Sequence, residues 1–360
     1  MKKYILILIA FIFVGCSQKD VGYKTTQESF DKPILQEEIQ SYEEVFKPKE
    51  DHFFQSELKN KIAIVFPSKV VGKYANGTIN TVLSQLFLNG IEFNLEVIDT
   101  YDETPLSIEN ALNELYEKKY KNILLLTTNT GLEVIENIQR AKEFTFFVPL
   151  VHKKNSVSTL NNIVYGGIDY EQQLDTLFTF SNGKETVFST QTPLGSRLRS
   201  MILEKSSKLY MDTIIDLDKN NYKHIVTNKS LSGSTLFMNT SIIKTSILLS
   251  QLRAHETEPA VILSTQLNYT PLIISLTQYL DRKNFLIANS IESVDFKIEE
   301  TAALLDADIV YNWVNYSTLI GINYLLKNPS YLFNPIINNQ VQYRTQIYKN
   351  TAYGFRKHTN

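Results

Sequence analysis

From residue 61 onward, short apolar runs alternate with segments of helical period. The first run, 61–66, reads Lys-Ile-Ala-Ile-Val-Phe and lacks polar alternation, which is typical of a parallel strand buried on both faces. A polar loop is expected over 68–77, before a helix over 78–88. The later expected strands are 93–98, 122–126, 144–151, 162–165, 186–189, 208–215, 260–264 and 285–288. The later expected helices are 104–119, 131–141, 169–180, 194–206, 241–252 and 270–280. This order predicts parallel sheets covered by helices on both faces.

The alternation restarts after Val151, and the chain exceeds the length of one typical domain. We therefore predict an α/β protein of two Rossmann-like lobes. Three crossings are expected between the lobes, near 163–165, 308–313 and 339–342. The expected lobe boundaries are 57–164 plus 314–339 for lobe 1, and 165–313 plus 340–360 for lobe 2.

The N-terminus has the order of a secreted lipoprotein. Lys2 and Lys3 precede an apolar run over 4–14, and Gly15-Cys16-Ser17 follows. As a helix the run would measure about 16 Å, too short for a hydrocarbon core of about 30 Å. We predict that residues 1–15 are a signal peptide and that Cys16 becomes the lipidated first residue. An uncleaved anchor, or an ordinary signal with a chance cysteine, is the alternative.

Residues 16–56 are predicted to be a flexible linker. The segment is rich in acidic residues, lacks a sustained apolar period and contains Pro33 and Pro48. A short helix over 34–46 is the other interpretation, because its apolar residues lie near helical spacing. Ser17, rather than an aspartate, follows the cysteine, so we expect anchoring at the periplasmic face of the outer membrane.

Composition excludes several classes of function. Cys16 is the only cysteine, so no disulfide framework or cysteine nucleophile is expected after acylation. The formal charge of −2 becomes −4 once Lys2 and Lys3 are removed, which argues against nucleic acid as a partner. The five histidines include no zinc-binding pair, and no nucleophile elbow, Walker loop or dinucleotide fingerprint occurs. We expect no enzymatic activity, no cofactor and no metal.

Short motifs resemble those of the type I periplasmic-binding superfamily. The apolar opening at 62–67 and Ile163-Val-Tyr-Gly-Gly-Ile-Asp-Tyr170 match its first strand and first crossing, and three later segments, 258–265, 308–313 and 341–347, also match. Within that superfamily the layout is most similar to the penicillin-binding-protein activator lipoproteins, which stimulate a peptidoglycan synthase from the outer membrane. The chain departs from them because its spacer is too short for their helical-repeat domain.

Polar residues that follow the expected strands are candidates to line a cleft, because ligands of open α/β sheets bind beyond the carboxyl ends of strands. The loop 127–130 (Thr-Thr-Asn-Thr) would present hydroxyl and N–H groups to an anion, although simple capping of the next helix is the other interpretation. Asp169 could hold a ligand ammonium or cap the helix that it opens. The candidates are Ser68, Lys69, Thr127, Thr128, Asn129, Thr130, Asp169, Tyr170, Gln191, Thr192, Thr265 and Gln266.

The segment 328–339 is a Pro- and Asn-rich loop that carries apolar side chains. It either packs inward as a core plug or serves as a protein-contact loop, with Tyr331 and Phe333 as the contact candidates.

Two classes of function follow. The first is a non-enzymatic envelope lipoprotein that acts by contact with a protein, such as a penicillin-binding protein. The second is a receptor that closes on an amino acid or small anion and passes it to an ABC-type permease. The weak chemistry of the expected cleft favours the first.

Overall fold

The computed structural model describes residues 60–328 and 334–359. The predicted signal peptide, Cys16, the predicted linker 16–56 and the contact candidates Tyr331 and Phe333 therefore lie outside the described residues. Within the described ranges, no helix combines the length and the apolar character needed to cross a membrane.

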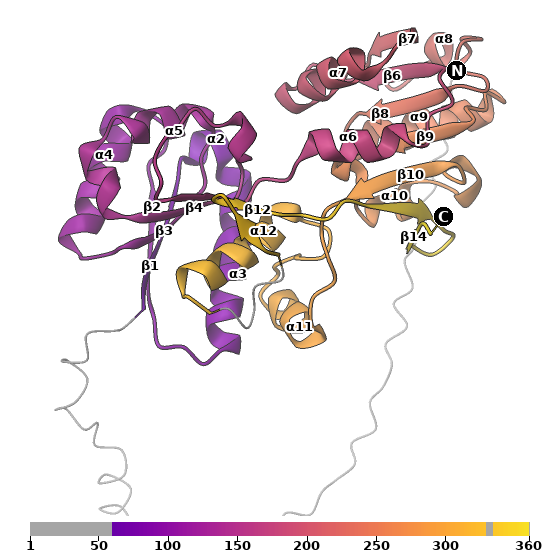
Figure 1. The fold of residues 1–360 in the computed structure, drawn as a ribbon. Helices are drawn as coiled ribbons and strands as arrows, with labels where there is room; N and C mark the ends of the chain where they lie inside the picture. Colours follow the sequence, from indigo (N-terminus) through magenta and orange to yellow (C-terminus); the bar gives the residue numbers. More distant parts are fainter. Residues whose placement is uncertain (1–59, 329–333, 360) are drawn as a thin grey trace, which may run out of the picture. The chain divides into compact units, whose positions relative to one another are not determined.

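Two seven-stranded sheets form the centres of two α/β lobes, which confirms the predicted architecture (Figure 1). The first sheet has the order β11-β12-β5-β4-β3-β1-β2 and the second β14-β13-β10-β9-β8-β6-β7. The strands of the first sheet are β1 Lys61–Phe66, β2 Asn94–Asp99, β3 Asn122–Leu125, β4 Thr145–Val148, β5 Ile163–Tyr165, β11 Ile336–Ile337 and β12 Gln340–Val341. Those of the second are β6 Glu185–Ser189, β7 Leu209–Ile214, β8 Thr235–Asn239, β9 Val261–Ser264, β10 Phe285–Asn289, β13 Gln346–Asn350 and β14 Phe355–Lys357.

Pairing is parallel through the body of both sheets, and the antiparallel pairs among the described strands are β11–β12, β10–β13 and β13–β14. The carboxyl ends of the parallel strands therefore meet at one edge of each sheet, and the loops that follow them hold the candidate site.

Helices cover both faces of the first sheet (Figure 1). One core contains Val82 and Leu86 of α3 with Ile320 of α12, and the other contains Leu112 of α4 and Leu132 of α5. The helical elements of lobe 1 are α2 Ser68–Val71, η1 Gly72–Tyr74, α3 Ala75–Leu88, α4 Pro105–Glu117, α5 Asn129–Glu136, η2 Gln139–Glu143, η3 Lys153–Asn155, α11 Phe296–Leu304 and α12 Trp313–Leu325. Apolar strands that contact helices on both sides explain the unbroken apolar runs of the sequence.

The second sheet is covered in the same way. Leu174 of α6 and Leu198 of α7 pack on one face, and Leu248 of α9 and Ile273 of α10 pack on the other. The helical elements of lobe 2 are α6 Tyr170–Phe178, α7 Pro193–Lys205, α8 Lys223–Val226, α9 Ile242–Ala254, η4 Gln266–Asn268, α10 Leu272–Leu276 and η5 Tyr279–Asp281.

The three crossings are present, but the second lies earlier than the sequence predicts. The chain leaves the second sheet directly after β10, since Ile291 is already buried in a core of lobe 1 and α11 packs against α3. The predicted position, 308–313, instead borders the cleft. The boundary predicted between 339 and 340 also divides the β11–β12 hairpin, whereas the pairing of Gln340 with Tyr165 assigns β12 to the first sheet.

Two local predictions are wrong. The polar loop expected over 68–77 is helical, because Val71 and Ala75 are buried and hold the segment on the body of lobe 1. The helix expected over 270–280 is interrupted between α10 and η5, where Thr277 is extended and its carbonyl oxygen accepts a hydrogen bond from buried Arg282.

Candidate functional site

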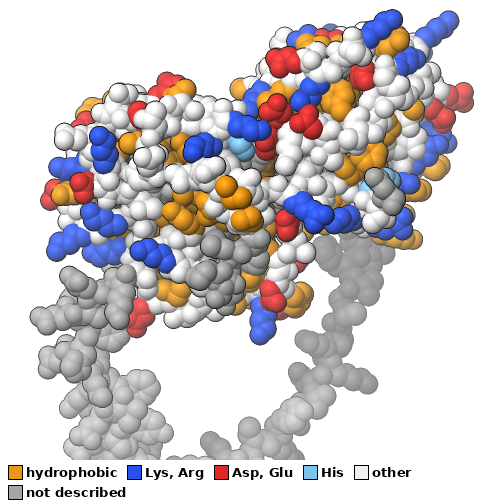
Figure 2. All heavy atoms as spheres, viewed as in Figure 1, with side chains coloured by type: hydrophobic (Ala, Val, Ile, Leu, Met, Phe, Trp, Pro, Cys, Tyr) orange, Lys and Arg blue, Asp and Glu red, His pale blue; other side chains and the backbone are white. Residues whose placement is uncertain are grey.

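A cleft of about 820 Å³ is lined by residues of both lobes. Lobe 1 contributes the loops after β1, β3 and β4, and lobe 2 contributes the start of α6, the first turns of α7 and the segment after β9. Figure 2 shows basic side chains, acidic side chains and a histidine gathered where the lobes meet. A cleft at the carboxyl ends of parallel strands is the expected ligand position in an open α/β fold.

Five aromatic side chains belong to the wall of this cleft. Tyr74, Tyr170 and Trp313 line it and pack against a core of lobe 1, while Tyr269 and Tyr311 line it with ring centroids 5.4 Å apart. Burial, followed by the effect of the Tyr74 hydroxyl, raises the pKa of Tyr170. Tyr170 is therefore a neutral phenol at physiological pH and is able to donate a hydrogen bond.

The predicted anion site at 127–130 does line the cleft, but its donors are already engaged. The hydroxyl and the backbone N–H of Thr128 donate to the Glu103 carboxylate over 2.6 and 2.7 Å, and the Thr127 hydroxyl donates to it over 2.7 Å. The Thr128 hydroxyl also accepts the N–H of Thr130 and so caps α5. A carboxylate of the chain itself thus occupies the position that the sequence suggests for an external anion.

Several other sequence candidates do not reach the cleft. Ser68 donates its backbone N–H to Asp99, and Gln191 is exposed outside the lining. Thr265 is fully buried, and its hydroxyl has no hydrogen-bond partner among the described residues. Thr192 accepts the N–H of Gly195 as the N-cap of α7.

Gln266 lines the cleft but is held by a buried polar network. Its side-chain N–H donates to Asn289, its side-chain oxygen accepts the N–H of Ser290, and its own backbone N–H donates to Gln173. Gln266 therefore fixes the wall of the cleft.

Asp169 acts as a cap and as an ion-pair partner, and it does not line the cleft. It accepts the N–H groups of Glu171 and Gln172 at the start of α6, and its carboxylate lies 2.7 Å from the ammonium of Lys154 in lobe 1. Burial pushes the pKa of Asp169 upward, but the bonds from Lys154 and Gln172 outweigh it and lower the pKa overall. The capping interpretation is therefore the one that the geometry supports.

His152 is predicted to make the fold sensitive to mild acid. Burial lowers its pKa below 6.5, with Lys154 and Arg197 acting in the same direction, while Asp169 and Glu171 oppose the shift. Because the unfolded chain then binds more protons at this site, the associated stability is complete above about pH 6.5 and falls as the pH drops through the folded-state pKa. The melting temperature of wild-type protein should decline below pH 6.5. The decline should be shallower in His152→Gln.

The matched control for this experiment is His224→Gln, since His224 is exposed in α8. Its pH profile should follow the wild type, and identical profiles for all three proteins would contradict the assignment.

Sequence reasoning missed the aromatic residues of the lining other than Tyr170, and it also missed two basic residues. Lys73 in η1 and Arg197 in α7 both line the cleft, from opposite lobes. Each lies inside a segment rather than directly after a strand, so the rule of strand ends could not select it. Neither forms an ion pair with a described carboxylate. The guanidinium of Arg197 donates across the lobes to Asn155 over 2.6 Å.

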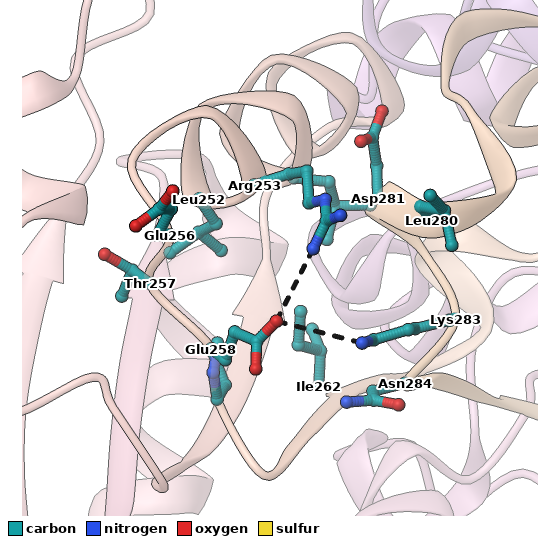
Figure 3. A pocket seen from close by; sticks show the side chains of 12 residues that line it. Leu252, Arg253, Glu256, Thr257, Glu258, Ile262, Leu280, Asp281, Lys283 and Asn284 are labelled. Carbon is teal, nitrogen blue, oxygen red and sulfur yellow. Dashed lines mark hydrogen bonds and ion pairs between the residues drawn. The ribbon is translucent and has the colours of Figure 1, made fainter.

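A second hollow lies on the surface of lobe 2, near the end of α9 (Figure 3). Its volume of about 40 Å³ leaves room for only a few water molecules. Glu258 at its rim is paired with Arg253 and Lys283. These charges stabilise one another, and the hollow is too small to hold a metabolite. Within residues 60–328 and 334–359, no cluster of three or more potential ligands that could hold a metal ion is found.

Comparison with known proteins gives the fold. No family model and no curated protein matches the sequence. Among solved structures, a branched-chain amino acid ABC transporter from Thermus thermophilus with bound valine has a TM-score of 0.59 and 12% identity over 83% of this chain and 95% of its own. The LpoA C-domain from Haemophilus influenzae, a regulator of PBP1A, has a TM-score of 0.54 and 11% identity over 83% of this chain and 100% of its own. The fold is the two-lobed type I periplasmic-binding fold.

Proposed function

We propose that this chain is a non-enzymatic protein of the cell envelope whose main partner is another protein, a peptidoglycan synthase of the penicillin-binding class. This proposal rests mainly on the hydrogen bonds that the Glu103 carboxylate accepts from Thr127 and Thr128. A receptor for amino acids needs open donors for the carboxylate of its ligand, and here the donors at the start of α5 are already satisfied. The structural similarity to a regulator of PBP1A supports the same function.

An anchored position fits this role. We propose that Cys16 carries the lipid and that the linker 16–56 holds the body at the periplasmic face of the outer membrane. A partner that spans the periplasm would then be within reach.

The surface of lobe 2 offers a candidate contact in addition to Tyr331 and Phe333. Leu272 and Leu276 lie one turn apart on α10, Tyr279 and Leu280 follow on η5, and each is between 41% and 50% exposed. Exposed apolar side chains that gather on one segment are typical of protein-contact surfaces, and aromatic anchors dominate interface energies.

The test is reconstitution with the bifunctional penicillin-binding proteins of the same organism. The purified protein should raise the rate of glycan polymerisation from a lipid-linked precursor. Phe333→Ala and Tyr279→Ser should each weaken the contact by about 30-fold, the effect of losing about 2 kcal/mol at an aromatic anchor. The matched control is Tyr353→Ser, because Tyr353 is almost fully exposed in the β13–β14 turn. Unchanged synthesis rates with every synthase tested would refute the proposal.

A solute receptor is the second candidate, and the cleft itself favours it. A volume of about 820 Å³ falls within the usual range of small-molecule sites, roughly 300–1,000 Å³. Calorimetric titration with valine, leucine and isoleucine separates the two functions. Saturable binding of one of them, lost in folded Thr128→Ala and retained in Phe333→Ala, would favour the receptor. We expect no such binding.

A further inference from the structure

The charges that line the cleft are unbalanced. Lys73 and Arg197 are without a carboxylate partner among the described residues, whereas Arg199, two residues further along α7, is paired with Asp212. Among the described residues, Asp308 is the one carboxylate of the lining, and its Oδ1 accepts the N–H groups of Val310 and Tyr311. The Glu103 carboxylate is engaged by Thr127 and Thr128, and the described lining otherwise presents two cations against a single carboxylate, one oxygen of which is engaged in a turn.

These two cations belong to different lobes. The ammonium of Lys73 lies 4.8 Å from the ring centroid of Tyr74 in lobe 1, and Arg197 belongs to the first turns of α7 in lobe 2. The guanidinium has five N–H donors, and its bond to Asn155 leaves donors for a second acceptor. An anion in the cleft could therefore be contacted by both lobes.

The aromatic residues of the lining favour a ligand with a flat apolar group. Tyr74, Tyr170, Tyr269, Tyr311 and Trp313 line the same cleft as the two cations. Aromatic faces prefer another ring in an offset or edge-on arrangement. A zwitterion would need an acidic partner for its ammonium, and in the described part of the lining Asp308 is the only carboxylate for that role.

We propose that the cleft binds a small organic anion that carries an aromatic ring, of which an aryl carboxylate is the simplest member. Arg197 and Lys73 hold the anionic group, and the ring lies against Trp313 and the tyrosines. A planar guanidinium matches the two oxygens of a carboxylate, which makes Arg197 the principal contact. The inference goes beyond the contact function proposed above and does not depend on it, because it concerns a different surface and a different partner.

Trp313 provides the measurement, because it is the only tryptophan of the chain and it lines the cleft. We expect 3-phenylpropionate to change the tryptophan fluorescence of the purified protein in a saturable manner. The matched probes 3-cyclohexylpropionate and 3-phenyl-1-propanol lack the ring and the charge respectively. Each should bind at least about 10-fold more weakly, in line with the loss of a stacked ring or of a charge-assisted hydrogen bond.

Substitutions in the lining identify the residues that contact the anionic group of the ligand. Arg197→Gln should weaken the binding of 3-phenylpropionate by roughly 10- to 100-fold, the usual effect of losing a hydrogen bond to a charged group. Lys73→Gln should produce a smaller loss, because an ammonium lacks the planar pair of donors with which a guanidinium matches a carboxylate. Arg199→Gln and Lys69→Gln are the matched controls, since both residues lie outside the cleft lining and should leave the affinity unchanged.

Calorimetry of the same titration detects binding that leaves the tryptophan fluorescence unchanged. No saturable heat and no change in fluorescence would overturn the proposal, as would equal losses in Arg197→Gln and Arg199→Gln. Tighter binding of valine than of 3-phenylpropionate would also overturn it. Stimulation of the synthase is measured separately, so failure of the contact function and failure of the ligand site are distinguishable.

Discussion

Replacing Glu103 by alanine is expected to lower the free energy of unfolding by about 3 kcal/mol. The carboxylate accepts three hydrogen bonds, from the hydroxyls of Thr127 and Thr128 and from one backbone N–H. Thr127 is buried, so its hydroxyl would lose its partner without gaining water. Each donor left unsatisfied costs about 1–3 kcal/mol when water cannot replace the lost acceptor. Urea denaturation of the variant measures the loss, and Glu109→Ala on the exposed side of α4 is the control.

The same variant should regain stability in acetate. Removal of the side chain leaves a vacant position among the donors at the start of α5, and a small carboxylate can enter it. Acetate at about ten times its dissociation constant would restore about 1.4 kcal/mol by mass action. Wild-type protein should not respond, because Glu103 already occupies the position. An alanine variant as stable as the wild type, or acetate stabilisation of equal size in both proteins, would show that these donors do not need Glu103.

Introducing valine at Gly321 should destabilise the protein by about 3 kcal/mol or more. Gly321 lies in α12, where a β-carbon would come within 2.3 Å of the ring of Phe147 in β4. In an exposed helix, exchange of glycine for alanine normally stabilises by about 1 kcal/mol. Here the close approach of helix and sheet outweighs that gain, because overpacking a filled core costs typically 1–3 kcal/mol and more for a branched side chain. The midpoint of chemical denaturation measures the effect.

A second change tests the steric explanation. Phe147→Leu removes the ring that a new side chain would meet, so it should recover part of the loss when combined with Gly321→Val. Gly166 approaches the same ring from the crossing after β5, so the ring is enclosed from two sides. A Gly321→Val protein of wild-type stability, or a double variant without any recovery, would contradict the prediction.

The sequence predicts the parallel strands well, because strands buried on both faces appear as unbroken apolar runs. β8 was not predicted, although it is an internal strand of the second sheet, between β9 and β6. Only Leu236, Phe237 and Met238 are apolar in this strand, and the flanking Thr235 is buried through hydrogen bonds with Asn182. A buried hydroxyl with a distant partner leaves no periodic signal in the chain.

The sequence predicts those residues of the candidate site that come directly after a strand. The loop 127–130 and Tyr170 do line the cleft, as expected from that rule. The occupation of the loop by Glu103 could not be foreseen, because the partners are 24 and 25 residues apart and belong to different loops. Lys73 and Arg197 likewise become cleft residues only when two lobes come together.

Both sheets receive strands from the end of the chain. β12 joins β5 in the first sheet, and β13 joins β10 in the second, so each lobe contains segments that are far apart in sequence. Neither sheet can be completed before nearly the whole chain is available, and long-range pairing of this kind slows folding. The lobes are therefore expected to unfold together, and truncation of the last fifteen residues should expose the edge of β10 to association with other chains.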